Sequence, residues 1–160
     1  MMWHLSHRGD QYACRIADRH YNRQSIGSSQ CAPPGRCMVL TADKALWITS
    51  WPFAEWVKHD WAGARMCSSF RNESEAKASK MVRQAVAATR AFFGDPPPLG
   101  MVTFVDPDEV RAKANPGHCF IIAGFRPVGF TKGGLLALRL LPAKMPEPQA
   151  PLGLQMGFAA

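Results

Sequence analysis

Apolar positions along the chain recur with a period of either about 3.6 or about 2 residues, and these periods predict helices and strands respectively. Residues 10–21, DQYACRIADRHY, place Tyr12, Ile16 and His20 at helical spacing behind Asp10, which is a suitable N-cap residue. We therefore expect a helix over this segment, with His20 on or beside its buried stripe.

The clearest helical pattern covers residues 71–95. Asn72 stands three positions before Glu75, as in a capping box, and apolar side chains then recur at helical spacing. Gly94 and the three prolines that follow it are strong signals for the end of a helix.

The other predicted elements are short. They lie at residues 36–52 (a hairpin that turns at 42–44), 53–64 (a loop with a short helical excursion), 64–70 (a strand), 99–106 (a strand), 118–124 (a short helix) and 125–142 (a last hairpin that turns at 132–134). This order predicts an α/β fold, of the α+β three-layer kind, with a mixed central sheet flanked by helices. We expect one domain over residues 1–141 and a mobile, proline-rich tail over 142–160.

Composition narrows the class of protein. The chain has 160 residues, of which 47% are hydrophobic and 19% charged, as expected for one folded domain. It has neither an apolar run long enough to cross a membrane nor a signal-peptide pattern at residues 1–10, so we expect a cytoplasmic protein. Its five cysteines include no C-x-x-C pair, which argues for reduced thiols rather than a disulfide framework or a zinc knuckle.

Charge and aromatic residues point to a polyanionic partner. Lys and Arg number 19 against 12 Asp and Glu, which gives a net charge of +7. Tryptophans and basic residues are interleaved near residues 44–65, a pattern that suits stacking on an unpaired base in a basic groove. The candidate nucleic-acid contacts are Arg23, Arg36, Trp51, Trp56 and Lys58. Against this, tryptophans are also ordinary core and rim residues, and a basic protein need not bind DNA.

A long polar loop at residues 19–37, RHYNRQSIGSSQCAPPGRC, is the first candidate site, because structureless loops of this length are often functional. It opens with His20 and Tyr21. An imidazole can exchange a proton or bind a metal, and a phenol can donate a proton or stack on a base. The structural alternative is a histidine that serves the carboxyl end of a helix.

Two further candidate sites lie where strands end. Ser68, Ser69 and Arg71 occupy the predicted strand-to-helix junction, where backbone amides and an arginine can bind an anion, although Asn72 and Glu75 are equally suited to capping the helix. Asp106 ends a predicted strand and can act as a base or ligand, but an aspartate before a proline also initiates turns. His118 is a candidate ligand or base with a structural alternative of its own.

Several short motifs, taken together, resemble the bacteriophage Mom-type DNA-modification family, a divergent branch of the GNAT acyltransferases. They are HYNRQ, the P-P-G-R-C entry to the first hairpin, SSFRNE, FVDP followed by G-H, and A-G-F-x-x-x-G. The resemblance covers residues 10–141 as an order of elements, and it implies a single GNAT-like domain.

The resemblance implies a transferase that adds a carbamoylmethyl group to the exocyclic amine of adenine in double-stranded DNA. In that family the modification protects phage DNA from host restriction inside the bacterial cytoplasm. The implied catalytic residues are His20 and Tyr21 from the His-Tyr element, Asp106 at the strand end, and Ser69 and Arg71 from the Ser/Arg junction, which also includes Ser68.

Two departures from the GNAT pattern concern catalysis and the cofactor. The aromatic before A-G-F is usually a tyrosine, whereas here it is Phe120, which cannot transfer a proton, so a phenolic acid would have to be Tyr21 or Tyr12. The glycine-rich loop that cradles the pyrophosphate of acetyl-coenzyme A is replaced by RNESEAKAS, whose Glu73 and Glu75 would repel it.

The resemblance leaves room for a metal and for two other functions. Some Mom-like proteins are thought to use iron, for which His20, Tyr21 and His118, or Asp106, are candidate ligands. One alternative function is a conventional N-acetyltransferase that uses acetyl-coenzyme A on a small amine or a protein. The other is a non-catalytic DNA-binding accessory protein, which would explain both departures.

Overall fold

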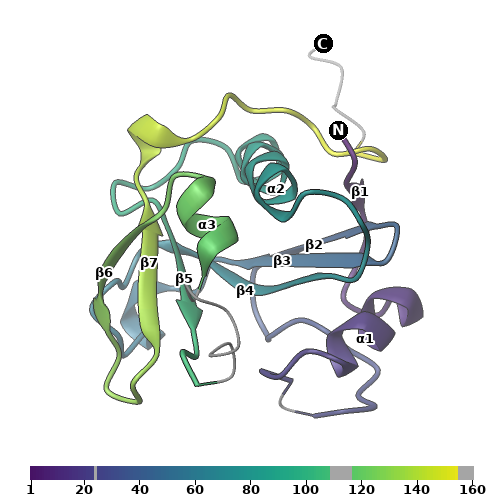
Figure 1. The fold of residues 1–160 in the computed structure, drawn as a ribbon, viewed down its shortest axis with the longest axis horizontal. Coiled ribbons are helices and arrows are strands. Elements are labelled where there is room, and N and C mark those ends of the chain that lie inside the picture. Colours follow the sequence, from purple (N-terminus) through teal and green to yellow (C-terminus); the bar gives the residue numbers. More distant parts are fainter. Residues whose placement is uncertain (24, 109–116, 155–160) are drawn as a thin grey trace.

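The chain forms a mixed sheet with helices on both faces (Figure 1). The computed structural model describes residues 1–23, 25–108 and 117–154. Within them, seven strands are arranged in the order β1-β2-β3-β4-β5-β7-β6. Their bounds are β1 His4–Leu5, β2 Cys37–Ala42, β3 Ala45–Ser50, β4 Arg65–Asn72, β5 Met101–Val105, β6 Arg126–Phe130 and β7 Leu136–Leu140. Neighbouring strands are antiparallel except β4 and β5, which are parallel.

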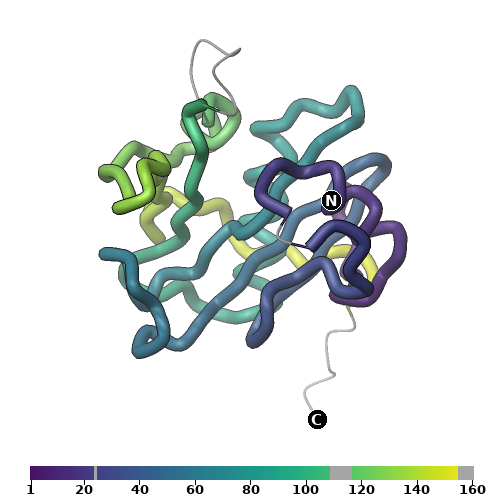
Figure 2. Tube along the Cα trace, turned by 90° about the horizontal axis from the view of Figure 1, so that it is seen from below, coloured from purple at the N-terminus to yellow at the C-terminus, as the bar shows by residue number. Residues whose placement is uncertain are grey.

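The helices divide between the two faces of the sheet. They are α1 Gln11–Asp18, α2 Ala78–Phe93 and α3 His118–Ile122, with 3-10 turns η1 Ala54–Trp56 and η2 Pro142–Lys144. Helices α2 and α3 lie on one face and α1 on the other (Figure 1), and Figure 2 shows the purple N-terminal segment lying across the strands from the α1 side. The predicted fold class, a mixed α/β sheet flanked by helices in three layers, is confirmed.

Each layer buries its own apolar cluster. The largest lies between α2, α3 and the sheet, where it includes Trp47, Val82 and Phe125. A second lies beneath α1, whose Ile16 packs with Ile48 and other residues of β2 and β3. The fully buried Trp3 anchors the N-terminal segment and donates its indole N–H to the Met81 carbonyl at 2.9 Å.

A buried hydrogen-bond chain links β3 to α2. The indole Nε1 of Trp47 donates to Thr49 Oγ1 at 2.7 Å, Thr49 Oγ1 lies 3.0 Å from Thr89 Oγ1, and Thr89 donates to the Ala85 carbonyl at 2.8 Å. Because Thr89 uses its proton on that carbonyl, the Thr49 hydroxyl must donate to Thr89. The chain therefore satisfies every side-chain donor within it.

The predicted start of the long helix was wrong. Helix α2 begins at Ala78, and Asn72 is instead the last residue of β4, paired with Ala45. The Asn72 side chain accepts from the Ser74 backbone N–H and donates to the Ala76 carbonyl, so it organises the connecting loop and does not cap the helix. Continued pairing with β3 supplies backbone hydrogen bonds that a helix starting here would forgo.

The segment predicted as a mobile tail packs onto the domain as far as it is described. In residues 142–154, Gln149 N donates to the Ala87 carbonyl, and Leu152 exchanges backbone hydrogen bonds with Trp3 and Leu5. These contacts tie the segment to α2 and β1, a strand that the sequence pattern did not predict. The remainder of the predicted tail, 155–160, lies outside the described residues.

Among the described residues, no helix is long and apolar enough to cross a membrane.

Candidate active site

A cleft opens where the parallel strands β4 and β5 part. They pair only between residues 65–67 and 101–103, after which β4 continues along β3 as far as Asn72. Ser68 is the extra residue of a β-bulge, because Ile48 faces Ser69 while Thr49 faces Cys67. The bulge lies at the point of divergence and turns the strand locally.

Two adjoining cavities of about 350 and 640 Å³ make up the cleft. Their shared wall consists of Tyr21, Asn22, Cys67, Ser68 and Phe104. The larger cavity continues beneath α3 to Phe120 and reaches Ala78, the first residue of α2. A cleft of this size, mainly apolar with a few converging polar groups, suits a small molecule or a nucleobase.

The first residues of the long loop form one wall of the cleft. His20 Nε2 lies 3.2 Å from the Phe70 carbonyl, and its Nδ1 accepts the backbone N–H of Asn22 at 3.1 Å. Since Nδ1 accepts, Nε2 carries the proton and donates to the carbonyl. Burial lowers the pKa of His20 below its ordinary value, so the neutral ring is favoured.

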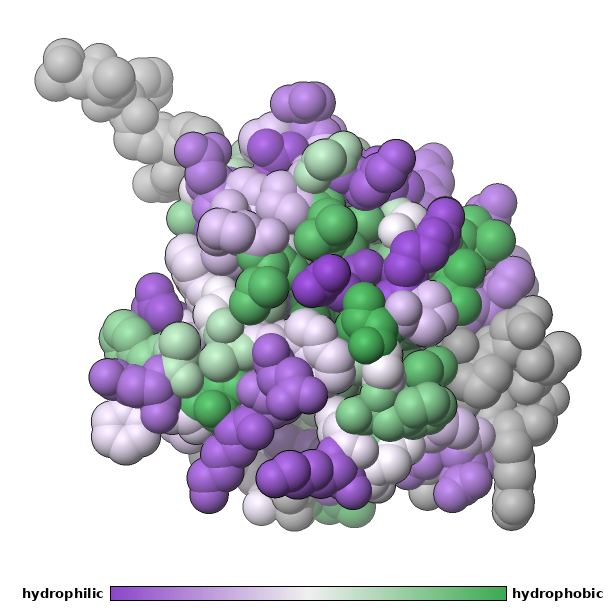
Figure 3. All heavy atoms as spheres, turned by 90° about the vertical axis from the view of Figure 1, so that its left-hand side faces the viewer, coloured by the Kyte–Doolittle hydropathy of each residue, from purple (hydrophilic) through white to green (hydrophobic). Residues whose placement is uncertain are grey.

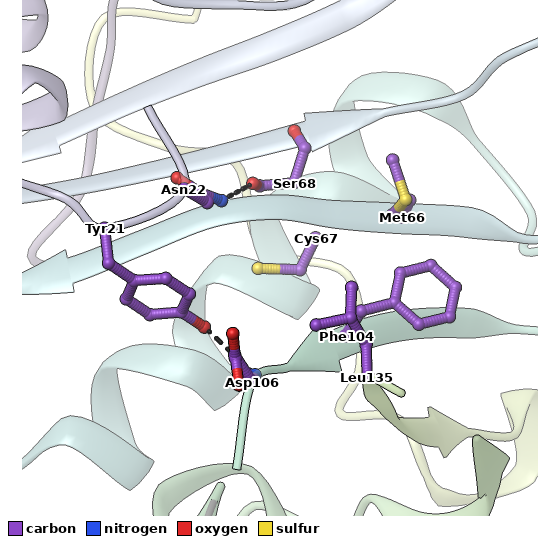
Figure 4. A pocket seen from close by; sticks show the side chains of 8 residues that line it. All are labelled: Tyr21, Asn22, Met66, Cys67, Ser68, Phe104, Asp106 and Leu135. Atoms are coloured by element: carbon purple, nitrogen blue, oxygen red, sulfur yellow. Dashed lines mark hydrogen bonds between the residues drawn. The ribbon is translucent and has the colours of Figure 1, made fainter. Parts of the chain in front are cut away.

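Tyr21 reaches across the cleft to the end of β5 (Figure 4). Its ring stacks on His20 with centroids 4.6 Å apart, and its phenol oxygen accepts the backbone N–H of Asp106 at 3.4 Å. Asp106 also accepts the Asp108 N–H through Oδ1, so the turn-initiating role considered for it is confirmed. Tyr21 and Asp106, predicted separately as site residues, are thus brought together.

Asn22 bridges the loop to the bulge. Its Nδ2 donates to the Ser68 carbonyl at 2.8 Å, as Figure 4 shows, and its side chain lines both cavities. No local sequence pattern indicates this contact, because the partner of Asn22 lies 46 positions away along the chain.

A charged cluster borders the larger cavity. Arg71 lines the cavity and donates Nε to Glu73, while Arg19 makes two hydrogen bonds of 2.7 Å to the same carboxylate. The hydrogen bonds from Arg19 and Arg71 lower the pKa of Glu73 to about 2. Glu73 therefore stays ionised. Because two arginines surround its one negative charge, the cluster of three residues carries a net positive charge.

The rest of the long loop is organised by Arg23. This side chain pairs with Asp18 at 2.9 Å and donates to the carbonyls of Ser28 and Gln30. It is only 10% exposed, so it holds the loop together and does not face outward as a DNA contact would. The hydrogen bond from Arg23 also lowers the pKa of Asp18.

The other predicted nucleic-acid contacts lie around the β3–β4 connection, and none of them lines either cavity of the cleft. The guanidinium carbons of Arg36 and Arg65 lie 4.7 and 4.3 Å from the ring centroid of Trp51, so cation–π contacts already engage this ring. Trp56 is 75% exposed, and Lys58 is exposed. Figure 3, which faces the β6 side of the molecule, shows small hydrophobic groups separated by hydrophilic ones.

Ser69 and His118 differ in their relation to the cleft. Ser69 lines neither cavity, and its hydroxyl is buried without a hydrogen-bond partner among the described residues. His118 does line the larger cavity. In the described part of the chain no three His, Cys, Asp or Glu side chains are grouped to hold a metal, and both ring nitrogens of His20 are engaged in hydrogen bonds.

Cys67 contributes a thiol to the wall shared by the two cavities. Burial raises the pKa of this thiol above its ordinary value, so it stays protonated and behaves as a small apolar group. A nucleophilic role for Cys67 is therefore disfavoured.

Comparison of the chain with protein-family models, curated proteins and solved structures returns no match.

Proposed function

We propose that this protein is a transferase that modifies the exocyclic amine of adenine in DNA. The observation that carries the proposal is that Tyr21 and Asp106 line one cavity between diverging parallel strands, where the Tyr21 phenol accepts the Asp106 backbone N–H. A phenol and a carboxylate at one cleft suit a reaction in which an amine loses a proton and a leaving group gains one. The resemblance to the Mom-type family supports the same reaction class.

The two side chains have complementary roles in this proposal. The amine nitrogen forms a bond to an electrophilic carbon of the donor, and the bond from that carbon to its leaving group breaks. The Asp106 carboxylate takes the proton that the amine loses, and the Tyr21 phenol protonates the leaving group. His20 positions Tyr21 through ring stacking; both of its nitrogens are engaged, so it is not the proton carrier.

DNA is the favoured substrate because of charge. The net charge of +7 attracts a polyanion, and Arg71 lines the cleft while Arg19, paired with the same Glu73, adds a positive charge behind it. An adenine inside a duplex is out of reach of such a cleft, so the target base must leave the stack. Binding should weaken steeply as salt concentration rises.

The chain offers a matched pair of variants, because it has two tyrosines of nearly equal exposure, Tyr21 at 46% and Tyr12 at 45%. Plasmid from cells that express the protein should resist restriction enzymes whose sites contain adenine. In Tyr21→Phe this protection should fall by about 10²-fold or more, the usual contribution of a general acid. Tyr12→Phe should keep it, since its hydroxyl only bonds the β2–β3 turn. Equal protection by both variants would reject the role of Tyr21.

A conventional N-acetyltransferase is the second candidate. It is favoured by the parallel β4–β5 pair within an otherwise antiparallel sheet, and by the position of Ala78 at both the cleft and the start of α2. Tight, saturable binding of acetyl-coenzyme A by calorimetry would support it. DNA binding with neither base modification nor acetyl transfer would support the non-catalytic accessory protein instead.

A further inference from the structure

The carboxamide of Asn22 is held in one orientation at the centre of the cleft. Its partner, the Ser68 carbonyl oxygen, can only accept a hydrogen bond, so the group that points at it must be the amide NH₂. The Asn22 backbone is fixed as well, because its N–H donates to His20 Nδ1. A flip of the amide would bring two oxygens together and lose the bond.

This clamp leaves a defined pair of groups for a ligand. An asparagine amide has two donor protons and one acceptor oxygen, and Ser68 takes one proton. Among the described residues, none hydrogen-bonds to the second proton; the His20 ring also interacts with the Asn22 side chain, but Oδ1 has two lone pairs, so one acceptor position remains. The side chain is exposed and lines both cavities. The cleft therefore presents one donor beside one acceptor, in a fixed order.

Adenine carries the complementary pair, an amino donor beside a ring-nitrogen acceptor, and asparagine can bind both at once. Hypoxanthine, its deaminated form, has the opposite order on its Watson–Crick edge, with a carbonyl acceptor beside a ring N–H. A freely rotating amide could adapt to either base. Because the Ser68 carbonyl prevents the flip, Asn22 should accept adenine and reject hypoxanthine when both bases enter the cleft in the same orientation, which their common attachment to the DNA backbone favours.

We infer that Asn22 is the specificity-determining residue of the cleft and reads the amino group and adjacent ring nitrogen of the target adenine. The inference rests on the proposed function, since it assumes that a base enters the cleft. It adds a recognition role for a residue that takes no part in the proposed proton transfers, and it explains why the bulge carbonyl is engaged by a side chain and not by a neighbouring strand.

The test is DNA binding by the whole 160-residue chain, which does not require activity. Fluorescence anisotropy would compare labelled duplexes that carry adenine or hypoxanthine opposite an abasic site, where the base leaves the stack easily. The wild-type protein should bind the adenine duplex at least about fivefold more tightly, the low end for a bidentate contact. Asn22→Ala should bind both duplexes alike, at the wild-type hypoxanthine level.

The matched control is Gln30→Ala, which removes an exposed amide from the same loop and should keep the adenine preference. Equal binding of the two duplexes by the wild-type protein would overturn the inference, even if Asn22→Ala does not fold. A preference that survives in a folded Asn22→Ala variant would also overturn it.

The proposed function has a separate readout, which is modified adenine in plasmid DNA. Modification by a wild-type protein that binds both duplexes equally would leave the proposed function standing without Asn22 as the reader. Selective adenine binding that depends on Asn22, without modification, would support the recognition role while removing the proposed reaction.

Discussion

The Thr49→Val variant should be less stable to unfolding than the wild-type protein, because it lacks the oxygen that accepts the hydrogen bond of a buried indole. Trp47 is fully buried and donates Nε1–H to the Thr49 hydroxyl at 2.7 Å, and Thr49 is itself fully buried. Valine keeps the shape of threonine but has no oxygen. The indole donor then has no acceptor, which should lower the free energy of unfolding by about 1–3 kcal/mol.

The control is Thr89→Val, one step further along the same chain. It removes the acceptor of the Thr49 hydroxyl, while the Trp47 indole keeps its own partner. The buried Thr49 hydroxyl then lacks its acceptor, so a loss in the same range of about 1–3 kcal/mol is expected. Thr49→Ser retains the hydroxyl and should recover part of the stability lost in Thr49→Val.

Urea unfolding, followed by tryptophan fluorescence and circular dichroism, gives the three free energies. In thermal melts each kcal/mol should appear as a shift of about 2–4 °C for a chain of this length. We would reject this role of Thr49 if Thr49→Val cost no more than Thr49→Ser, because the indole would then have no need of the Thr49 oxygen. The comparison also tests how α2, whose first residue lines the cleft, is docked on the sheet.

Three further predictions concern pH and the backbone. Burial lowers the pKa of His20, so stability should decrease as pH falls below about 6.5. Urea titrations at pH 7.5 and 5.5 should show a smaller decrease for His20→Gln than for the wild-type protein. Two arginines lower the pKa of Glu73 from 4.5 to about 2. The contribution of Glu73 to the free energy of unfolding should therefore be complete above pH 4.5 and disappear as pH falls toward 2. Glu73→Gln should remove this part of the acid transition. Gly100→Ala should cost about 3 kcal/mol or more, since φ is +73° and a Cβ would collide with the Leu140 carbonyl. Gly133→Ala should be nearly neutral in the same melts, because its Cβ would meet only Thr131 Oγ1 at an ordinary 3.9 Å.

Local patterning was sufficient for the elements that bury a regular face. The β2–β3 hairpin and the final β6–β7 hairpin lie where apolar runs on either side of turn residues predict them. Helix α2 was recognised by its apolar period, but its start was placed too early. The capping-box signal at Asn72 is local, whereas the pairing of Asn72 with Ala45 is a tertiary contact that no local pattern reveals.

The candidate site was predictable only in part. His20 and Tyr21 could be suspected from the loop that they open, and Asp106 from its place at a strand end. Their convergence depends on contacts between distant segments, such as that from Asp106 N to the Tyr21 phenol, 85 positions apart. Asn22 lies in HYNRQ and Ser68 in SSFRNE, but neither motif indicates the bulge or the hydrogen bond between the two residues, because an asparagine in a polar loop is ordinary.

The most direct test of the proposed function is mass spectrometry of nucleosides digested from plasmid DNA of bacteria that express the protein. The account predicts a fraction of deoxyadenosine with an added mass, absent from cells without the protein and strongly reduced with Tyr21→Phe. Unchanged deoxyadenosine in the presence of folded wild-type protein would contradict it.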